Sequence, residues 1–203
     1  MNLRVLLRPT GILLACVFAA SCGTEAPPET TTEPLVTVEP RPEIYAEFTL
    51  SADLSALSDD QRQMIRILIE ASQIMDDLFW RQSYGDDYKA WLNSIGNAKA
   101  RRFAELNYGP WDRLDDEKPF VSGMGAKPLG ARFYPEDMSK PEFEEAYLPG
   151  KKGHYSLVRR NTKGELVLVP YHVAYREELG RVAGLLRQAA KLAESSDFAT
   201  YLK

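Results

Sequence analysis

The chain has 203 residues, of which 25 are basic and 29 acidic, and its formal net charge at neutral pH is −4. Removal of a leader that contains Arg4 and Arg8 lowers the basic count to 23 and makes the formal charge about −6. The rest of the chain has no basic stripe interleaved with aromatic residues, and an acidic protein is repelled by phosphate backbones. The composition therefore argues against nucleic acid as a partner.

Residues 1–22 have the features of a bacterial export signal that ends in a lipidation site. A positively charged start precedes a short apolar run, Ile12 to Ala20, which is too short to span a bilayer. The sequence Ala19-Ala20-Ser21-Cys22, which overlaps the end of this run, resembles a lipobox. It predicts cleavage before Cys22 and acylation of that cysteine. The alternative is an ordinary signal peptide cut near Ala20 or Ser21, which would leave Cys22 as a free thiol.

The use of cysteine agrees with lipidation. Cys16 is lost with the leader, so Cys22 is the single thiol of the mature chain and no intramolecular disulfide is possible. A multiply acylated cysteine predicts a stable membrane anchor, because one acyl chain alone binds only marginally. Gly23 stands where an aspartate would favour the inner membrane. We therefore expect a location in the bacterial cell envelope, on the outer membrane and facing the periplasm.

Two regions follow the leader. Residues 23–43 are rich in Pro, Thr and Glu, and this composition predicts a disordered tether. Residues 44–203 are numerous enough for one domain with its own core.

The first half of this domain is predicted to be helical. Ser58 and Gln61 have the spacing of a capping box, and the apolar residues after them recur with helical periodicity, which predicts a helix from Asp59 to about Arg81. A second helix is predicted from Asp86 to Leu106, with a weak point at Gly96. The following segment, 107–135, is predicted to be loop-rich because Gly and Pro residues interrupt it.

The second half combines a hairpin with helices. A short helix is expected over Pro141–Tyr147, and two strands, Tyr155–Arg160 and Leu166–Tyr171, surround a turn that ends in glycine. Tyr175–Glu194 is predicted to be a helix, and Ser196 begins a further apolar turn that we expect to continue beyond Leu202. The apolar stripe of the longer helix consists of Leu179, Val182, Ala183, Leu186, Ala189, Ala190 and Ala193. The predicted fold class is therefore α+β, predominantly helical with a small β-hairpin.

Three sequence blocks in one order carry a family resemblance. They are FAELNYGPWDRLDDEKPF (103–120), GAKPLGARFYPEDM (125–138) and HYSLVRRNTKGELVLVPYHVAY (154–175). Together they resemble the N-terminal segment of the dipeptidyl-peptidase III-like family of zinc metallopeptidases. The resemblance implies an incomplete lobe of a larger peptidase-like fold, and in full-length relatives a zinc-bound water that attacks the peptide bond with a glutamate as general base.

The family's HExxGH zinc motif does not occur in this sequence. We therefore assign no catalytic residue and no metal ligand, and we expect a chain that is inactive alone, holds no cofactor of its own and has a downstream catalytic segment as a partner. The alternative is a stand-alone lipoprotein that binds a peptide or protein partner through the loops from Tyr108 to Tyr134.

Tyr108, Trp111 and Arg113 form an aromatic and cationic cluster that suits the wall of a peptide groove. The competing interpretation is that these aromatic residues pack a turn onto the core. The two histidines, His154 and His172, would face each other across the predicted hairpin. A zinc site needs a third ligand, so we interpret them as surface or packing residues.

Two short motifs are excluded by their surroundings. Glu177-Glu178-Leu179-Gly180 resembles the end of a Nudix box, but Val173 and Ala174 occupy the positions of the required Arg–Glu pair, so we interpret the glutamates as helix-surface charge. The glycines around Lys127 and Pro128 lack the strand-to-helix context of a phosphate-binding loop, and we interpret them as part of a structured loop.

Overall fold

The computed structural model describes residues 38–203, so the predicted leader, Cys22 and most of the predicted tether lie outside the described residues. Within 38–203, none of the helices combines the length and the apolar character that crossing a membrane requires.

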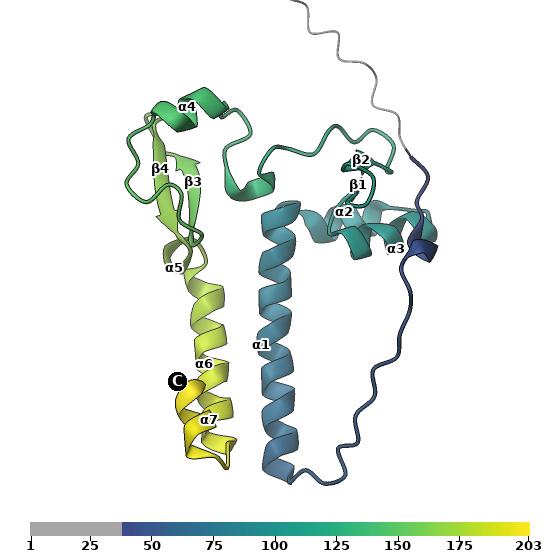
Figure 1. The fold of residues 1–203 in the computed structure, drawn as a ribbon, viewed down its shortest axis with the longest axis vertical. Coiled ribbons are helices and arrows are strands. Elements are labelled where there is room, and N and C mark those ends of the chain that lie inside the picture. The colour runs from purple at the N-terminus through teal and green to yellow at the C-terminus, as the bar shows by residue number, and fades with distance from the viewer. Residues whose placement is uncertain (1–37) are drawn as a thin grey trace, which may run out of the picture. The chain divides into compact units, whose positions relative to one another are not determined.

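Helix α1 (Asp59–Ser83) begins where the sequence predicted and continues slightly further (Figure 1). The Ser58 hydroxyl accepts a hydrogen bond from the Gln61 backbone N–H at 3.2 Å, and the Gln61 side chain accepts one from the Ser58 N–H at 3.0 Å. This capping box satisfies amide groups at the helix start that have no partner within the helix. The predicted start of the helix is confirmed.

The single helix predicted from Asp86 to Leu106 is wrong. The structure has two helices, α2 (Tyr88–Ser94) and α3 (Ala98–Asn107). Ile95 between them is buried and has extended backbone angles, and the Asn97 side chain accepts a hydrogen bond of 3.0 Å from a backbone N–H in the first turn of α3. Gly96, which has a low helix propensity, is followed directly by Asn97, which caps α3. The helix therefore ends and a new one begins at this point.

A long loop follows α3, as the sequence predicted. It contains the paired strands β1 (Trp111–Asp112) and β2 (Lys118–Pro119) and the single 3₁₀ turn η2 (Ala131–Phe133). Phe120, next to β2, packs on the fully buried Phe103 of α3, with ring centroids 4.6 Å apart. This contact fixes the start of the loop on the helical layer.

The N-terminal part of the described chain also packs on this loop. Val38 donates a backbone hydrogen bond of 2.9 Å to the Pro119 carbonyl, and Arg41 forms an ion pair with Asp112, whose side chain is completely buried. The 3₁₀ turn η1 (Pro42–Ile44) follows. Residues 38–43, which the sequence analysis assigned to the tether, therefore make defined contacts with the folded part.

The hairpin consists of β3 (Ser156–Arg160) and β4 (Leu166–Pro170), which are antiparallel with Ser156 opposite Pro170. In its loop, the Asn161 side chain accepts backbone hydrogen bonds from Lys163 and Glu165 at 2.9 and 3.0 Å. The predicted hairpin is confirmed. The short helix α4 (Lys140–Glu145) precedes it and is also confirmed, with a start one residue earlier than predicted.

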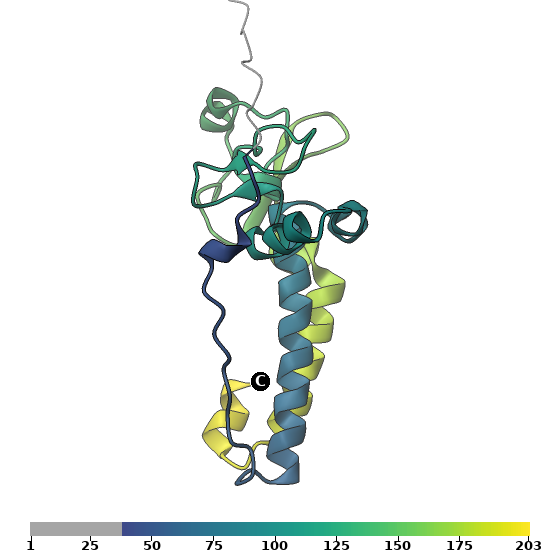
Figure 2. The same ribbon diagram turned by 90° about the vertical axis from the view of Figure 1, so that its right-hand side faces the viewer.

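Three helices complete the chain: α5 (Tyr171–Ala174), α6 (Arg176–Leu192) and α7 (Ser196–Tyr201). Figures 1 and 2 show that α6 runs antiparallel to α1 along most of its length. Their shared core contains Ile67, Ala71, Ile74, Leu185, Ala189, Ala190 and Leu202. The small side chains in this set let the two helices approach closely.

The predicted apolar stripe on α6 is correct in direction but omits its most deeply packed leucine. Leu185 is buried, whereas Leu186 is only partly buried at the edge of the same core. Over residues 38–203 the fold is α+β and mainly helical, as predicted, and it has two small antiparallel sheets.

A candidate binding cleft lined by arginines

A cleft of about 760 Å³ lies between the C-terminal end of α1, the segment around η2 and the β3–β4 hairpin. Its volume is within the range that is typical of ligand sites. We call it the arginine cleft, because four arginines line it. The full lining is Arg81, Gly85, Asp86, Asp87, Arg132, Tyr134, Pro135, Asp137, Leu157, Arg159, Arg160, Val169, Ala174 and Tyr175.

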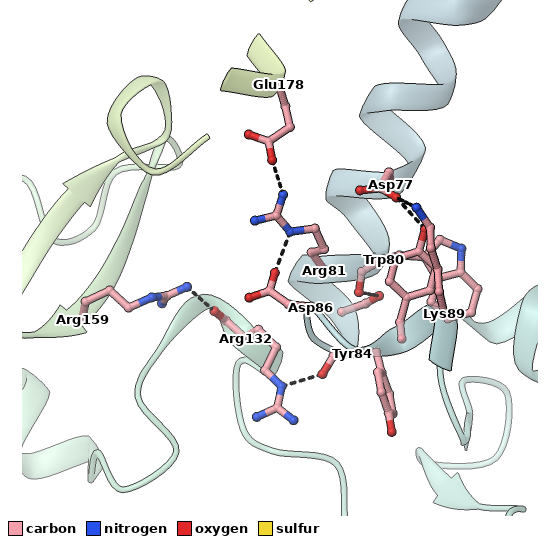
Figure 3. Close-up of polar contacts among 11 residues, drawn as sticks. Asp77, Trp80, Arg81, Tyr84, Asp86, Lys89, Arg132, Arg159 and Glu178 are labelled. Atoms are coloured by element: carbon pink, nitrogen blue, oxygen red, sulfur yellow. Dashed lines mark hydrogen bonds and ion pairs between the residues drawn. The ribbon is translucent and has the colours of Figure 1, made fainter. Parts of the chain in front are cut away.

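Arg81, in the last turn of α1, forms one wall of this cleft. Its Nε donates to Asp86 at 2.6 Å and its Nη1 pairs with Glu178 of α6 (Figure 3). The guanidinium carbon lies 5.7 Å from the centroid of the Tyr175 ring, a cation–π distance. Burial opposes the charged form of Arg81, but the hydrogen bonds to Asp86 and Glu178 outweigh burial, and the pKa of Arg81 is raised. Its charge is therefore used to join α1 to α6.

Arg132 and Arg159 connect the loop around η2 to its neighbours. Arg132 Nε donates to the Tyr84 carbonyl at 2.5 Å (Figure 3). Its Nη1 pairs with Glu136. Arg159 Nη2 donates to the Arg132 carbonyl at 3.0 Å. Its Nη1 donates to the Phe133 carbonyl at 3.2 Å and to the Val158 carbonyl at 2.8 Å. These bonds place both arginines at the cleft without using all of their donors.

Arg160, the last residue of β3, is fully paired. It contacts both carboxylate oxygens of Asp137, at 2.8 and 3.0 Å, and both of Glu142, at 2.8 and 3.0 Å. These hydrogen bonds raise the pKa of Arg160 and lower the pKa values of the Asp137 and Glu142 carboxyl groups. The network fixes α4 against the hairpin at the rim of the arginine cleft.

An aromatic cluster supports the cleft from the side of α1. Trp80 stacks on Tyr88 with ring centroids 4.8 Å apart, and Tyr84 stacks on Trp91 at 4.2 Å. Burial raises the pKa of the Tyr84 hydroxyl. The Tyr88 hydroxyl donates to the Asp77 carboxylate at 2.8 Å, and Lys89 forms an ion pair with the same carboxylate (Figure 3). Because Tyr84 also supplies the carbonyl that holds Arg132, the cluster positions one side of the cleft.

The structure gives different surroundings to the residues of the predicted peptide groove. Tyr108 and Trp111 join the aromatic cluster: Tyr108 ends α3 in a left-handed conformation with φ of 53° and donates to Asp76 at 2.6 Å, and buried Trp111 donates to the Gly125 carbonyl at 2.9 Å. Arg113 is exposed, and its Nη2 donates to the Leu106 carbonyl at 2.9 Å. None of the three lines the arginine cleft, and their proposed contact with a peptide stays a prediction.

A second concave surface lies on the side of α1 that faces the start of α5 and α6. It has a volume of about 560 Å³, and we call it the aromatic groove. Its lining is Met75, Leu78, Phe79, Gln82, Tyr155, Tyr171, His172, Tyr175 and Leu179. Phe79 is 46% exposed and Tyr155 is 79% exposed, so this surface offers large apolar side chains to a partner.

The two histidines lie at the base of the hairpin. The strand register ends at the pair of Ser156 and Pro170; His154 lies two residues before β3, and His172 lies in α5 directly after β4. Both are exposed. Across residues 38–203, no group of three His, Cys, Asp or Glu side chains is arranged to hold a metal ion.

Over residues 38–203 the fold is a helical α+β module that carries the arginine cleft and the aromatic groove. No protein-family model matches the chain. Dipeptidyl-peptidase III from Corallococcus sp. strain EGB is similar in structure, with a TM-score of 0.71 and 31% sequence identity over 78% of this chain and 32% of that one. DPP III from Caldithrix abyssi has a TM-score of 0.64 and 32% identity over 74% of this chain and 30% of that one. The resemblance to dipeptidyl-peptidase III that the sequence blocks predicted is confirmed.

The chain is also similar to a protein that is named as a Nudix hydrolase. The chain is 24% identical to Nudix hydrolase 3 of Arabidopsis thaliana over 212 residues, which covers 74% of this chain and 28% of that protein. In the structure Glu178 pairs with Arg81, and the position of the essential Nudix glutamate is Ala174. The chain thus spans between 28% and 32% of the length of the relatives that it matches.

Sequence reasoning did not find the arginine cleft. Its arginines come from α1, from the loop around η2 and from β3, and no spacing rule links positions so far apart. One signal was available in the sequence: the adjacent pair Arg159–Arg160 ends β3 directly after the apolar residues Leu157 and Val158.

Proposed function

We propose that this chain is a lipid-anchored module of the bacterial cell envelope that corresponds to the N-terminal part of a dipeptidyl-peptidase III-like protein and does not hydrolyse peptides alone. The observation that carries this proposal is the match to two solved DPP III structures, which includes about three quarters of this chain and about a third of theirs. A module that matches one part of a peptidase is expected to act together with the remainder of the fold.

The residues of the chain support the proposal that it does not hydrolyse peptides alone. A hydrolytic zinc site needs three protein ligands and an open position for water. His154 and His172 supply two imidazoles at most, and the described residues offer no third ligand beside them. The sequence also lacks HExxGH.

A polypeptide partner is supported by the aromatic groove. Its exposed Phe79 and Tyr155 rings lie beside the α1–α6 pair, and large exposed apolar surfaces are typical of interaction sites. We propose that a catalytic segment equivalent to the remainder of the DPP III fold packs on this groove. Zinc belongs to that segment in our proposal.

Metal analysis tests the proposal. The purified protein, incubated with zinc and passed through a desalting column, is expected to retain less than stoichiometric zinc by elemental analysis, because two exposed histidines form no closed site. Retention of one zinc per chain that is lost in both His154→Ala and His172→Ala would contradict the proposal and make the hairpin base a metal site.

Anchoring is tested separately. Cys22 lies outside the described residues, and the proposed lipid there is supported by the lipobox-like sequence alone. Wild-type protein is expected in a membrane fraction that requires detergent for release, and Cys22→Ala is expected in the soluble fraction because it lacks the acyl chains. Identical fractionation of the two proteins would exclude lipidation.

A second candidate function is that of a stand-alone lipoprotein that binds a peptide. The arginine cleft favours it, because a ligand-sized volume with a few converging polar groups is typical of binding sites. Binding of peptides by the chain alone, without a catalytic segment, would distinguish this candidate from the first.

A further inference from the structure

We propose that the arginine cleft binds a carboxylate through the free edge of the Arg159 guanidinium. This inference rests on the second candidate function, ligand binding in the arginine cleft, and deepens it by naming the chemical group that is bound.

The hydrogen bonds of Arg159 leave one edge of its guanidinium available. A guanidinium has five N–H donors. Both Nη1 donors are used by backbone carbonyls, and one Nη2 donor is used by the Arg132 carbonyl. The carbonyls of Arg132 and Phe133 are adjacent in the chain and occupy the end of the group, where Nη1 and Nη2 point together. The remaining donors are Nε–H and the second Nη2–H.

These two donors lie side by side and are parallel. That geometry matches the two oxygens of a carboxylate, which accept such a pair as a bidentate ligand. The Nε atom of Arg159 makes no hydrogen bond within 38–203 and is not one of the buried unpaired side-chain atoms there, so the Nε side of this edge is accessible. Since Arg159 lines the cleft, this edge is available to a ligand there.

Charge also singles out Arg159. The other three arginines of the lining have carboxylate partners: Arg81 with Asp86 and Glu178, Arg132 with Glu136, and Arg160 with Asp137 and Glu142. Arg159 has backbone carbonyls as its partners and no ion pair within the described residues. A partly buried cation that has no counter-ion favours an anionic ligand.

The rest of the lining restricts the kind of anion. Leu157, Val169 and the rings of Tyr134 and Tyr175 line the same cleft, which suits an apolar group attached to the carboxylate. Three aspartates line it as well, and Asp87 has no ion pair within the described residues. A ligand with several negative charges would be repelled by these carboxylates. The ligand class is therefore an apolar monocarboxylate, such as the C-terminal residue of a peptide or a small branched-chain acid.

Calorimetric titration of the purified protein tests this assignment with three probes. These are N-acetyl-alanyl-leucine with a free carboxylate, the same dipeptide as its C-terminal amide, and 4-methylpentanoate. The free-acid peptide is expected to bind at least about 10-fold more tightly than the amide, because a charged bidentate pair is lost in the amide. Stronger binding of the peptide than of 4-methylpentanoate would identify a peptide terminus as the source of the carboxylate, and equal binding would identify small acids.

Two variants locate the site. Arg159→Lys keeps the positive charge but loses the parallel donors, and it is expected to weaken binding of the free acid by about 10-fold. Arg187→Lys, on the exposed side of α6 and outside the cleft, is the matched control and is expected to bind as the wild type does. The proposal is overturned if acid and amide bind alike, if neither binds, or if Arg159→Lys binds the acid as tightly as wild type. The acid–amide comparison on wild type decides the matter even if Arg159→Lys fails to fold.

Discussion

The packing of α1 against α6 predicts a large loss of stability in Leu185→Ala. Leu185 is 9% exposed and belongs to the core that includes Ile67 and Ile74 of α1. Leucine-to-alanine changes in cores cost 2–5 kcal/mol, and because Ala71 and Ala189 beside it are too small to fill the space, we expect about 3 kcal/mol. In a chain of this size that corresponds to a fall in Tm of about 6–12 °C.

Thermal and urea unfolding, followed by far-ultraviolet circular dichroism, measure this effect. Leu129→Ala is the matched control, because the Leu129 side chain is 96% exposed, and it is expected to change the free energy of unfolding by less than about 0.5 kcal/mol. If Leu185→Ala lowers Tm no more than Leu129→Ala does, the two helices do not form the core that we describe.

Two further predictions concern charged groups. Asp112→Ala removes the completely buried carboxylate that pairs with Arg41 and accepts from the Leu114 N–H, so it is expected to lower the free energy of unfolding, measured by urea unfolding. A free energy of unfolding equal to that of the wild type would mean that the N-terminal segment does not pack there. Hydrogen bonds from Arg160 lower the pKa values of Asp137 and Glu142, so the stability that these carboxylates add is present at neutral pH and is lost as the pH falls through the lowered pKa values. Tm of the wild type is therefore expected to fall more steeply with acidification than Tm of Arg160→Gln, and parallel curves would show that the network does not exist in solution.

Local signals in the sequence predicted the regular elements well. The Ser58–Gln61 capping box and the turn at Asn161–Gly164 act through neighbouring atoms, so their structures follow from a few adjacent residues. The break at Gly96 was harder to predict. The apolar periodicity continues through it, and the buried position of Ile95, which tertiary packing decides, overrides that periodicity.

The candidate site depends on contacts between distant segments. Arg81 and Glu178 are separated by 97 positions, and Arg159 reaches the carbonyl of Arg132 across 27 positions. Such pairs leave no periodic signal in a single sequence. Trp111 had two interpretations from the sequence, the wall of a peptide groove or packing of a turn onto the core, and the structure places it in the core with its indole N–H bonded to the Gly125 carbonyl.

The central claim is that this chain resembles part of a dipeptidyl-peptidase and does not catalyse peptide hydrolysis alone. The most direct measurement is the release of dipeptides from dipeptidyl-arylamide substrates by the purified protein, with and without added zinc. We expect no release above the rate of a blank containing zinc and no protein, because the described residues provide no three-ligand zinc site. Turnover that is proportional to protein concentration, inhibited by a chelator and abolished in His172→Ala would contradict the account.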